Sequence, residues 1–182
     1  MKINVPTRRK ALSQVVTTLI ILVISILMTS GTLISYSTAV ASSSLKMEQL
    51  VIREARVWVN ETGAQSAVQV ENIGGRDALI TTVEVRYIEE EWSSIYYAHG
   101  ECTPLTPVQG MNITGPFSHT VADATLNFTQ ATGSILLPVG GSIVIYIDQP
   151  DSLDITDLGT IVYINVYTST LQYIDVIDVE LA

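Results

Sequence analysis

Hydrophobic and polar positions follow two different patterns along the chain. Residues 12–45 form an uninterrupted run of 34 positions without a charged side chain. A helix of that length would extend about 51 Å, at ~1.5 Å per residue. Because the hydrocarbon core of a bilayer needs only about 20 helical residues, the run predicts a helix that is too long to be a simple membrane span.

The two halves of this run differ in composition. Residues 12–28 are strongly apolar and suit lipid, whereas residues 29–44 are mostly small and hydroxylated. In the second half, Gly31, Ala39 and Ala41 would let helices approach closely and exchange hydrogen bonds. We therefore predict a helix that lies in the membrane first and later in a bundle of identical helices, with these three residues against neighbouring subunits. A lone membrane anchor with a Ser/Thr-rich stalk is the alternative.

Beyond residue 56 the hydrophobic period changes to two, which is typical of strands. Val68 and Val70 alternate with Gln69 and Glu71, so the valines are expected to point inward and the polar residues outward. From Leu79 to Tyr87, the odd-numbered residues are likewise expected to share one face. About seven short strands between turns predict an antiparallel β-sandwich. The expected strands cover residues 66–72, 79–87, 92–97, 121–128, 142–148, 160–168 and 171–181.

Three stretches between the expected strands are polar or irregular. Residues 99–116 are rich in proline and glycine and are expected to form a long surface loop. Residues 89–91 are three glutamates, which are expected to form a charge block at a turn or edge strand. An acidic loop follows residue 147 and would suit either calcium or solvent, although it lacks the EF-hand spacing, so we favour a solvated loop. Its aspartates are Asp148, Asp151, Asp154 and Asp157.

Charge is unevenly distributed and narrows the possible functions. Hydrophobic residues make up 47% of the chain and charged residues 15%, which allows a packed core. From residue 57 onward there are 2 basic and 16 acidic residues, so the formal charge of that part is 2 − 16 = −14. Such a body repels phosphate backbones, so we expect no nucleic-acid partner.

Candidate catalytic and metal-binding residues are few. The chain has one cysteine, Cys102, so it cannot form a disulfide within itself. A catalytic cysteine needs a base, and His99 is the local candidate, so we favour a packed thiol. His99 and His119 are too few for a metal site with the usual ligands, and nucleotide-binding or hydrolase motifs are absent. We expect no cofactor, no metal site and no enzymatic activity.

Three sequons occur in the acidic part of the chain. They begin at Asn60, Asn112 and Asn127, and each could accept an N-glycan if the body is exported. Three sequons on one body without lysine agree with an external location. We therefore predict glycosylation at these asparagines.

The N-terminus combines a basic cluster with the long apolar run. Arg8, Arg9 and Lys10 are followed by Ala11 and then by the run that begins at Leu12. A secretory signal peptide would have a shorter apolar region, with its small-residue cleavage site after that region. An ordinary signal-anchor held by the positive-inside rule is a second interpretation. The third is a class III signal, cut on the cytoplasmic side between the basic cluster and the apolar helix.

Residues 8–45 resemble the N-terminus of archaeal type IV pilins and archaellins. The similarity rests on the basic cluster, the segment KALSQVV at residues 10–16 and the Ile/Val/Leu/Thr run that follows. Val16 stands where bacterial type IV pilins usually have Glu, which fits the archaeal branch. The resemblance implies cleavage after Ala11 by a prepilin peptidase. It also implies an immunoglobulin-like sandwich after the helix, so the expected fold class is α+β.

The resemblance implies a division of the chain and a set of partners. Residues 1–11 would be the signal peptide, residues 12–54 the membrane and assembly helix, and residues 55–182 a surface β-sandwich. The mature protein would form an extracellular filament of identical subunits, raised from the cell membrane by an assembly ATPase and a membrane platform, and used for surface adhesion. The alternatives are an archaellum filament subunit and a membrane-anchored binding module or minor pilin.

Overall fold

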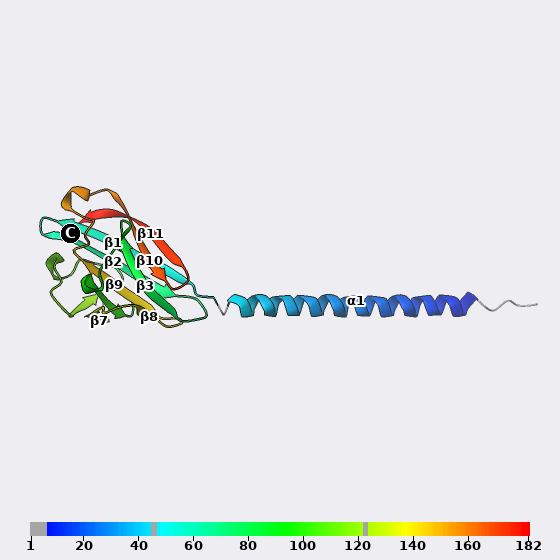
Figure 1. Cartoon of the computed structure of the whole chain (residues 1–182). Helices are drawn as coiled ribbons and strands as arrows, with labels where there is room; N and C mark the ends of the chain where they lie inside the picture. The colour runs from blue at the N-terminus through cyan, green and yellow to red at the C-terminus, as the bar shows by residue number, and fades with distance from the viewer. Residues whose placement is uncertain (1–6, 45–46, 122–123) are drawn as a thin grey trace, which may run out of the picture. The chain divides into compact units, whose positions relative to one another are not determined.

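The structure is a computed structural model in which the chain forms two units, Met1–Ser44 and Leu45–Ala182 (Figure 1). It describes the backbone of residues 7–44, 47–121 and 124–182, and the side chains of residues 13–40, 47–121 and 125–182. The first unit contains one helix, α1, at Thr7–Ser44. The second unit, which we call the body, is β-rich, so the α+β class predicted from the sequence is confirmed.

The helix α1 ends ten residues before the predicted end at residue 54. Residues 50–54 instead begin the strand β1, which pairs with β2 from Leu50 opposite Asn72 onward. Arg53, Glu54 and Arg56, which in sequence look like the charged end of a helix, form ion pairs within the body. Arg53 lies 2.5 Å from Glu71 in β2. The body therefore starts earlier than the predicted boundary at residue 55.

The described part of the body contains eleven strands and three short 3₁₀ helices. The strands are β1 Leu50–Asn60, β2 Gly63–Asn72, β3 Ala78–Val85, β4 Ile88–Glu89, β5 Ile95–His99, β6 Phe117–Val121, β7 Ala124–Gln130, β8 Ile135–Leu137, β9 Ser142–Asp148, β10 Ile161–Thr168 and β11 Gln172–Leu181. The 3₁₀ helices are η1 Trp92–Ser94, η2 Gln109–Met111 and η3 Ile155–Asp157. The expected strand at 121–128 is thus the hairpin β6–β7, and half of the one at 92–97 is η1.

The strands follow the continuous order β4-β3-β10-β11-β1-β2-β9-β5-β7-β6, with β8 paired to β3. The pairs are antiparallel except for β1 and β11, which are parallel, with Val57 opposite Val179. The sheet is therefore mixed, and the prediction of a purely antiparallel arrangement is wrong at this pair. Alternation within a strand shows which face is buried but carries no information about the direction of its neighbour.

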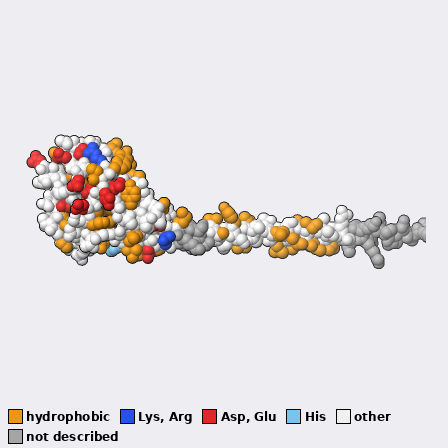
Figure 2. Space-filling model, in the orientation of Figure 1, with side chains coloured by type: hydrophobic (Ala, Val, Ile, Leu, Met, Phe, Trp, Pro, Cys, Tyr) orange, Lys and Arg blue, Asp and Glu red, His pale blue; other side chains and the backbone are white. Residues whose placement is uncertain are grey.

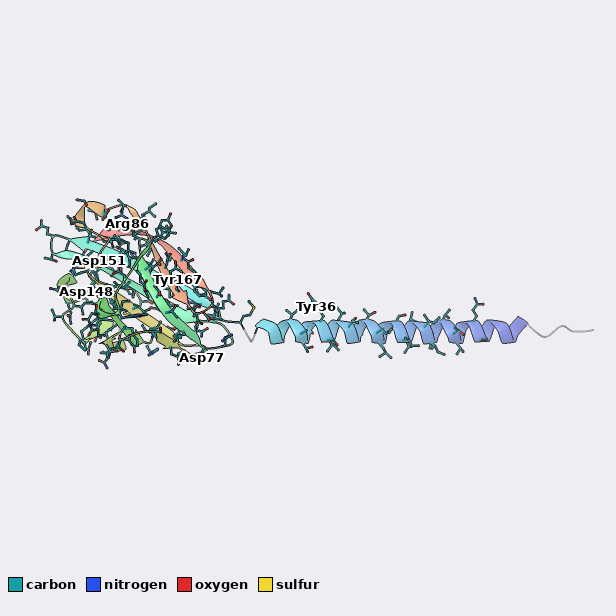
Figure 3. The ribbon with its side chains drawn as sticks, in the orientation of Figure 1. Tyr36, Asp77, Arg86, Asp148, Asp151 and Tyr167 are labelled. Carbon is teal, nitrogen blue, oxygen red and sulfur yellow. The ribbon has the colours of Figure 1, made fainter. Side chains whose placement is uncertain are left out.

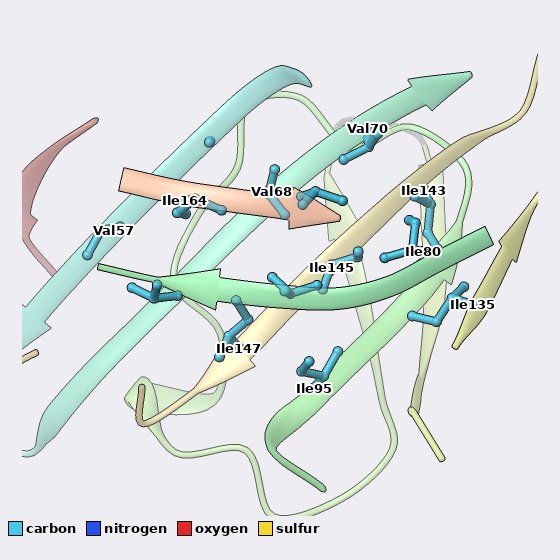
Figure 4. Close-up of a cluster of buried hydrophobic side chains, with 14 of the residues drawn as sticks. Val57, Val68, Val70, Ile80, Ile95, Ile135, Ile143, Ile145, Ile147 and Ile164 are labelled. Carbon is cyan, nitrogen blue, oxygen red and sulfur yellow. The ribbon is translucent and has the colours of Figure 1, made fainter. Parts of the chain in front are cut away.

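The main core contains side chains from strands on both sides of the β1–β11 pair in this order. In Figure 4, the strands that carry Ile80 and Ile164 cross in front of those that carry Val57, Val68 and Ile145. The side chains between them are mainly β-branched, which suits two facing pleated surfaces. The buried members include Val57, Val59, Val68, Val70, Ile80, Val83, Val85, Ile143, Ile145, Ile147, Val162, Ile164 and Val166.

A second core covers the other face of β2 and β9. Phe117 and Phe128 of the β6–β7 hairpin stack at 4.7 Å, and Phe128 meets Tyr146 of β9 edge-on at 5.2 Å. The segment 99–116 is an irregular loop with mostly exposed residues, as predicted, but it also contributes buried side chains to this core. Its apolar side chains pack onto the sheet and shield it from water. Those buried in the loop are Cys102, Leu105, Val108, Met111 and Ile113.

Two buried glutamines of β2 form hydrogen bonds with the loop at 99–116, mainly with its backbone. The Val108 amide donates to Gln65 Oε1 at 2.8 Å, and Gln65 Nε2 donates to the Val108 carbonyl at 3.3 Å. The Cys102 amide and the Thr103 hydroxyl both donate to Gln69 Oε1. Gln69 points away from the main core, as predicted, but it is buried because the loop lies over it.

A β-bulge in β3 changes the face that was expected for its first half. Opposite β10, the register passes from Thr82 directly to Ile80, so Thr81 has no partner. An extra residue reverses the alternation. Val83 and Val85 are buried as predicted, but before the bulge it is Ile80 that enters the core, and Leu79 is exposed.

Candidate assembly helix

The helix α1 carries apolar side chains on all sides. Every side chain from residue 13 to residue 40 is exposed, and Figure 2 shows the apolar ones along its length. The segment Ser13–Val40, 28 residues long, is apolar enough to cross a membrane, and nothing else in the described chain buries it. A helix of this kind needs lipid or protein around it. An N-terminal membrane span or signal-anchor is therefore compatible with α1.

Seven hydroxyl groups of α1 donate to carbonyls of the same helix. The Thr17 hydroxyl donates to the Ser13 carbonyl at 2.8 Å, and the Ser25 hydroxyl donates to the Ile21 carbonyl at 2.7 Å. The same contact to a carbonyl three or four residues earlier is made by Thr18, Thr29, Thr32, Ser37 and Thr38. Because these hydroxyls already have acceptors, they can enter lipid or a helix interface at little cost. The hydroxyl content is visible in the sequence, but this pairing within the helix is not.

Gly31 lies in a shallow hollow on the surface of α1. The hollow is lined by Met28, Gly31, Thr32, Ser35 and Tyr36, and Figure 3 shows Tyr36 projecting from the helix. A Cβ atom added at Gly31 would meet no atom within 4 Å. The chain itself therefore gives no steric reason for a glycine here.

The three predicted packing residues do not share one narrow face. At about 100° per residue, Ala39 lies about 80° from Gly31 on one side of the axis, and Ala41 about 80° from it on the other. Gly31 and Ala39 are exposed, whereas the side chain of Ala41 lies outside the described residues. Their contact with neighbouring subunits stays a prediction.

The predicted processing site falls at the start of α1. The helix begins at Thr7, so the backbone of Arg8, Arg9, Lys10, Ala11 and Leu12 is helical. The side chains of these residues lie outside the described part of the structure. Cleavage between Ala11 and Leu12 stays a prediction.

The three sequon asparagines lie on different parts of the body surface. Asn60 is half-buried in the β1–β2 turn, where its Oδ1 accepts the Thr62 amide at 2.8 Å. Asn112 is exposed directly after η2. Asn127 is exposed in β7, and its Oδ1 accepts the Ser118 hydroxyl at 2.6 Å. These contacts use the oxygen and not the Nδ2 atom that would carry a glycan.

The acidic loop after β9 uses most of its carboxylates in local structure. Asp148 accepts the Ile113 amide at 2.8 Å, and Asp154 caps η3. Asp157 accepts the Asp154 amide and the Arg86 guanidinium, and these contacts lower its pKa. Among the described residues no group of three or more His, Cys, Asp or Glu side chains could hold a metal ion, so these contacts favour the solvated-loop interpretation.

Glu90 does not lie in an exposed charge block, so the prediction for residues 89–91 is wrong at its centre. Glu90 is buried, and its Oε1 atom has no hydrogen-bond partner in the described chain. Burial, with the nearby charge of Asp151, raises the pKa of Glu90 to about 7. The glutamate run looks like a solvated turn in sequence, and nothing in it marks the middle residue for burial.

The remaining candidate for chemistry is Cys102, which is buried in the second core. Burial raises the pKa of its thiol, which disfavours the nucleophilic thiolate. The His99 ring packs edge-on against Tyr97 at 5.8 Å. These positions favour the packed-thiol interpretation.

Comparison with known proteins gives little further information. No protein-family model matches the chain, and no curated protein matches it either. Among solved structures, it is similar to a family 123 glycoside hydrolase from Clostridium perfringens, with a TM-score of 0.31 and 12% identity over 68% of this chain and 21% of that chain. The chain thus spans about a fifth of that enzyme's length. A TM-score of this size supports no conclusion about fold or function.

Proposed function

We propose that this protein is a structural subunit of an extracellular type IV pilus-like filament of the archaeal kind, used for surface adhesion. The observation that carries the proposal is α1, in which 28 consecutive residues, Ser13–Val40, are apolar enough for a membrane and are not buried by the chain. Polymerisation would replace lipid around this helix with the same helix of neighbouring subunits. The subunit would have no catalytic role and no cofactor.

The composition of α1 favours a bundle of helices over a lone anchor. About 20 residues suffice to cross the hydrocarbon core, so the small and hydroxylated half of α1 exceeds what an anchor needs. In this half the hydroxyls of Thr29, Thr32, Ser37 and Thr38 donate to carbonyls of the helix itself, and Gly31 opens a hollow on its surface. Helices in apolar surroundings associate through small residues of this kind.

The strand order supports an immunoglobulin-like sandwich, the body that the resemblance to archaeal pilins implies. The order β4-β3-β10-β11 reproduces the C′-C-F-G half of an immunoglobulin domain, and β1-β2-β9-β5 reproduces its A-B-E-D half. The main core contains residues from both halves. Such bodies would form the outer layer of the filament, with the sequon asparagines on their surface.

In this proposal the N-terminal segment controls the passage from membrane to filament. A prepilin peptidase would cut between Ala11 and Leu12 and remove four of the nine basic residues of the chain. Those charges would otherwise hold the helix end at the cytoplasmic face. An assembly ATPase with its membrane platform would then draw the free helix from lipid into the growing filament.

Electron microscopy of filaments sheared from the cell surface, with mass spectrometry of their N-terminus, tests the proposal. The expected result is this chain in the filament, beginning at Leu12. Chain found in the membrane fraction alone, with its basic cluster intact, would refute the filament and favour an anchored β-sandwich binding module. Because an archaellum subunit would share the helix and the sandwich, a deletion strain separates the two filament types by loss of attachment or loss of swimming.

A further inference from the structure

The three consecutive glutamates of the body border a small acidic hollow. The hollow has a volume of about 320 Å³ and is lined by Glu89, Glu90, Glu91 and Trp92. Glu89 and Glu91 are exposed, whereas Glu90 is only 6% exposed. The hollow therefore has two solvated carboxylates at its rim and a buried carboxyl group at its base. Its volume is near the lower end of the range of about 300–1,000 Å³ for ligand sites, which suits a small group.

Glu90 has no positively charged partner in the described structure. Its Oε1 atom is buried and accepts no hydrogen bond, while its backbone amide donates to the Val83 carbonyl at 3.0 Å. The charged group that acts on the Glu90 carboxyl is Asp151, labelled in Figure 3, which has the same sign. Burial and this charge raise the pKa of Glu90, and a weaker contact from the Asp151 backbone lowers it. A buried carboxylate without a cation is costly.

The described body does not supply the missing cation. The chain has no lysine after Lys46. Arg86 reaches the loop of Asp151, but its guanidinium donates to the Ser152 carbonyl at 3.1 Å and to Asp157 at 2.8 Å. The other arginines of the described body form ion pairs elsewhere or line a different hollow. Figure 2 shows Asp and Glu side chains gathered on one face of the body, and such a field attracts cations.

The side chains of the hollow favour an organic cation over a metal ion. Calcium prefers about six to eight oxygen ligands, and no group of three or more His, Cys, Asp or Glu side chains within the described ranges could hold a metal ion. A primary ammonium group has three N–H donors, which Glu90 and the rim carboxylates can accept. Trp92 lines the same hollow and packs against the main core. A tryptophan ring is the best aromatic partner for a cation.

We propose that this hollow binds a primary alkylammonium group, with the nitrogen at Glu90 and the alkyl chain against Trp92. The ammonium would replace the proton that the buried carboxyl group otherwise holds, so that one positive charge takes the place of another. Its source is a free amine or the lysine side chain of a partner protein, since both present the same group. The inference goes beyond the proposed filament and does not depend on it, because one chain supplies all the residues of the hollow.

Titration of the full-length chain in detergent micelles with n-butylammonium tests the site, with the indole N–H signal of Trp92 in NMR spectra as the readout. An alkylammonium stays charged up to about pH 10, so the pH dependence of binding reports on Glu90. If only the ionised form of Glu90 binds, the affinity should rise about 30-fold from about pH 5.5 to about pH 8.5, because the pKa of Glu90 is about 7. n-Butanol, which has the same alkyl chain without the charge, should not bind.

Matched variants separate the buried carboxylate from the acidic surroundings. Glu90→Gln should abolish the binding together with its pH dependence. Glu89→Gln is the control, because Glu89 lines the same hollow but is exposed, and it should weaken binding by less than about threefold. Trp92→Leu should weaken binding by about fivefold, which corresponds to the loss of one cation–π contact. Circular dichroism in the strand region checks that each variant is folded.

Two peptides that differ only in a lysine or a norleucine separate the two sources of the ammonium group. Tighter binding of the lysine peptide than of n-butylammonium supports a partner protein, and equal or weaker binding supports a free amine. Failure of both amines to bind, binding unchanged by pH or by Glu90→Gln, equal binding of n-butanol, or displacement of the amine by calcium would each overturn the site. Surface filaments without this chain would instead refute the proposed function and leave the site in place.

Discussion

Gly31→Leu tests whether α1 packs against its own copies. In the isolated chain the substitution has room, because an added Cβ meets no atom within 4 Å. Glycine costs a helix interior roughly 1 kcal/mol relative to alanine, and leucine is also a good helix former. The isolated α1 should therefore become more stable by about that amount. A loss of filaments can then come only from contacts between chains.

The magnitude of that loss follows from the hollow around Gly31. If a neighbouring backbone approaches there, leucine overpacks the contact by about 1–3 kcal/mol, which lowers the association constant roughly 5- to 150-fold. The cost recurs in every subunit of a polymer, so we expect filaments to be absent or to break on shearing. Gly31→Ala adds a single methyl group and should give an intermediate yield.

The assay compares sheared filament mass and filament length by electron microscopy for wild type, Gly31→Ala and Gly31→Leu. Carbonate extraction of membranes serves as the control for insertion, which should be unchanged because lipid accepts leucine readily. Circular dichroism in the strand region should also be unchanged, since the body is a separate unit. Wild-type yield and shear resistance for Gly31→Leu would refute packing at this surface and favour an anchored monomer.

Three further predictions address processing, modification and pH. Ala11→Trp should block cleavage and leave precursor in the membrane, and intact-mass analysis that finds mature chain in this variant would contradict the predicted cut. Glycopeptide mapping should find glycans on Asn60, Asn112 and Asn127, and three unmodified peptides from an N-glycosylating host would rule this out. The pKa of Glu90 is 4.5 in its ordinary, unfolded environment and about 7 in the folded body. As pH rises, Glu90 therefore loses its proton in the unfolded state before it does so in the folded state. Between pH 4.5 and pH 7 the free energy of unfolding should fall by up to about 3 kcal/mol. Glu90→Gln should remove that fall in denaturant titrations of the full chain, and an unchanged pH profile would show that Glu90 is not the responsible group.

The helix was predictable from sequence, but its end was not. A run without charges leaves few alternatives to an apolar helix, and α1 covers it as far as Ser44. The residues beyond it include Arg53, Glu54 and Arg56, which look like solvated side chains at a helix exit. In the structure Arg56 reaches Glu180 in β11 at 2.7 Å. That partner is far away in the chain, so a local pattern could not show that residue 56 belongs to a strand.

The layers around β2 show a second limit of local patterns. The alternation of apolar and polar residues predicted that Val68 and Val70 lie in a core, which is confirmed. It also predicted that Gln69 is exposed to solvent. The loop at 99–116 covers Gln69 and buries it. Gln69 stays polar because its side chain accepts a hydrogen bond from the loop backbone and needs no apolar partner. Buried glutamines that satisfy a backbone are indistinguishable in sequence from exposed ones. The apolar helix was the more predictable part, since it depends on the composition of one continuous segment.

The parallel pair of β1 and β11 has a kinetic consequence for the body. In the described strand order, β11 alone connects the β1-β2-β9-β5 half with the β3-β10 half. The two halves can therefore be joined only when residues 172–181 are present and paired. Closure over so long a stretch of chain makes folding slow relative to local helix formation. In the proposed export of the body, α1 would therefore enter the membrane while the body is still an unfolded chain. The body would gain its protease resistance in one late step, when its last strand arrives.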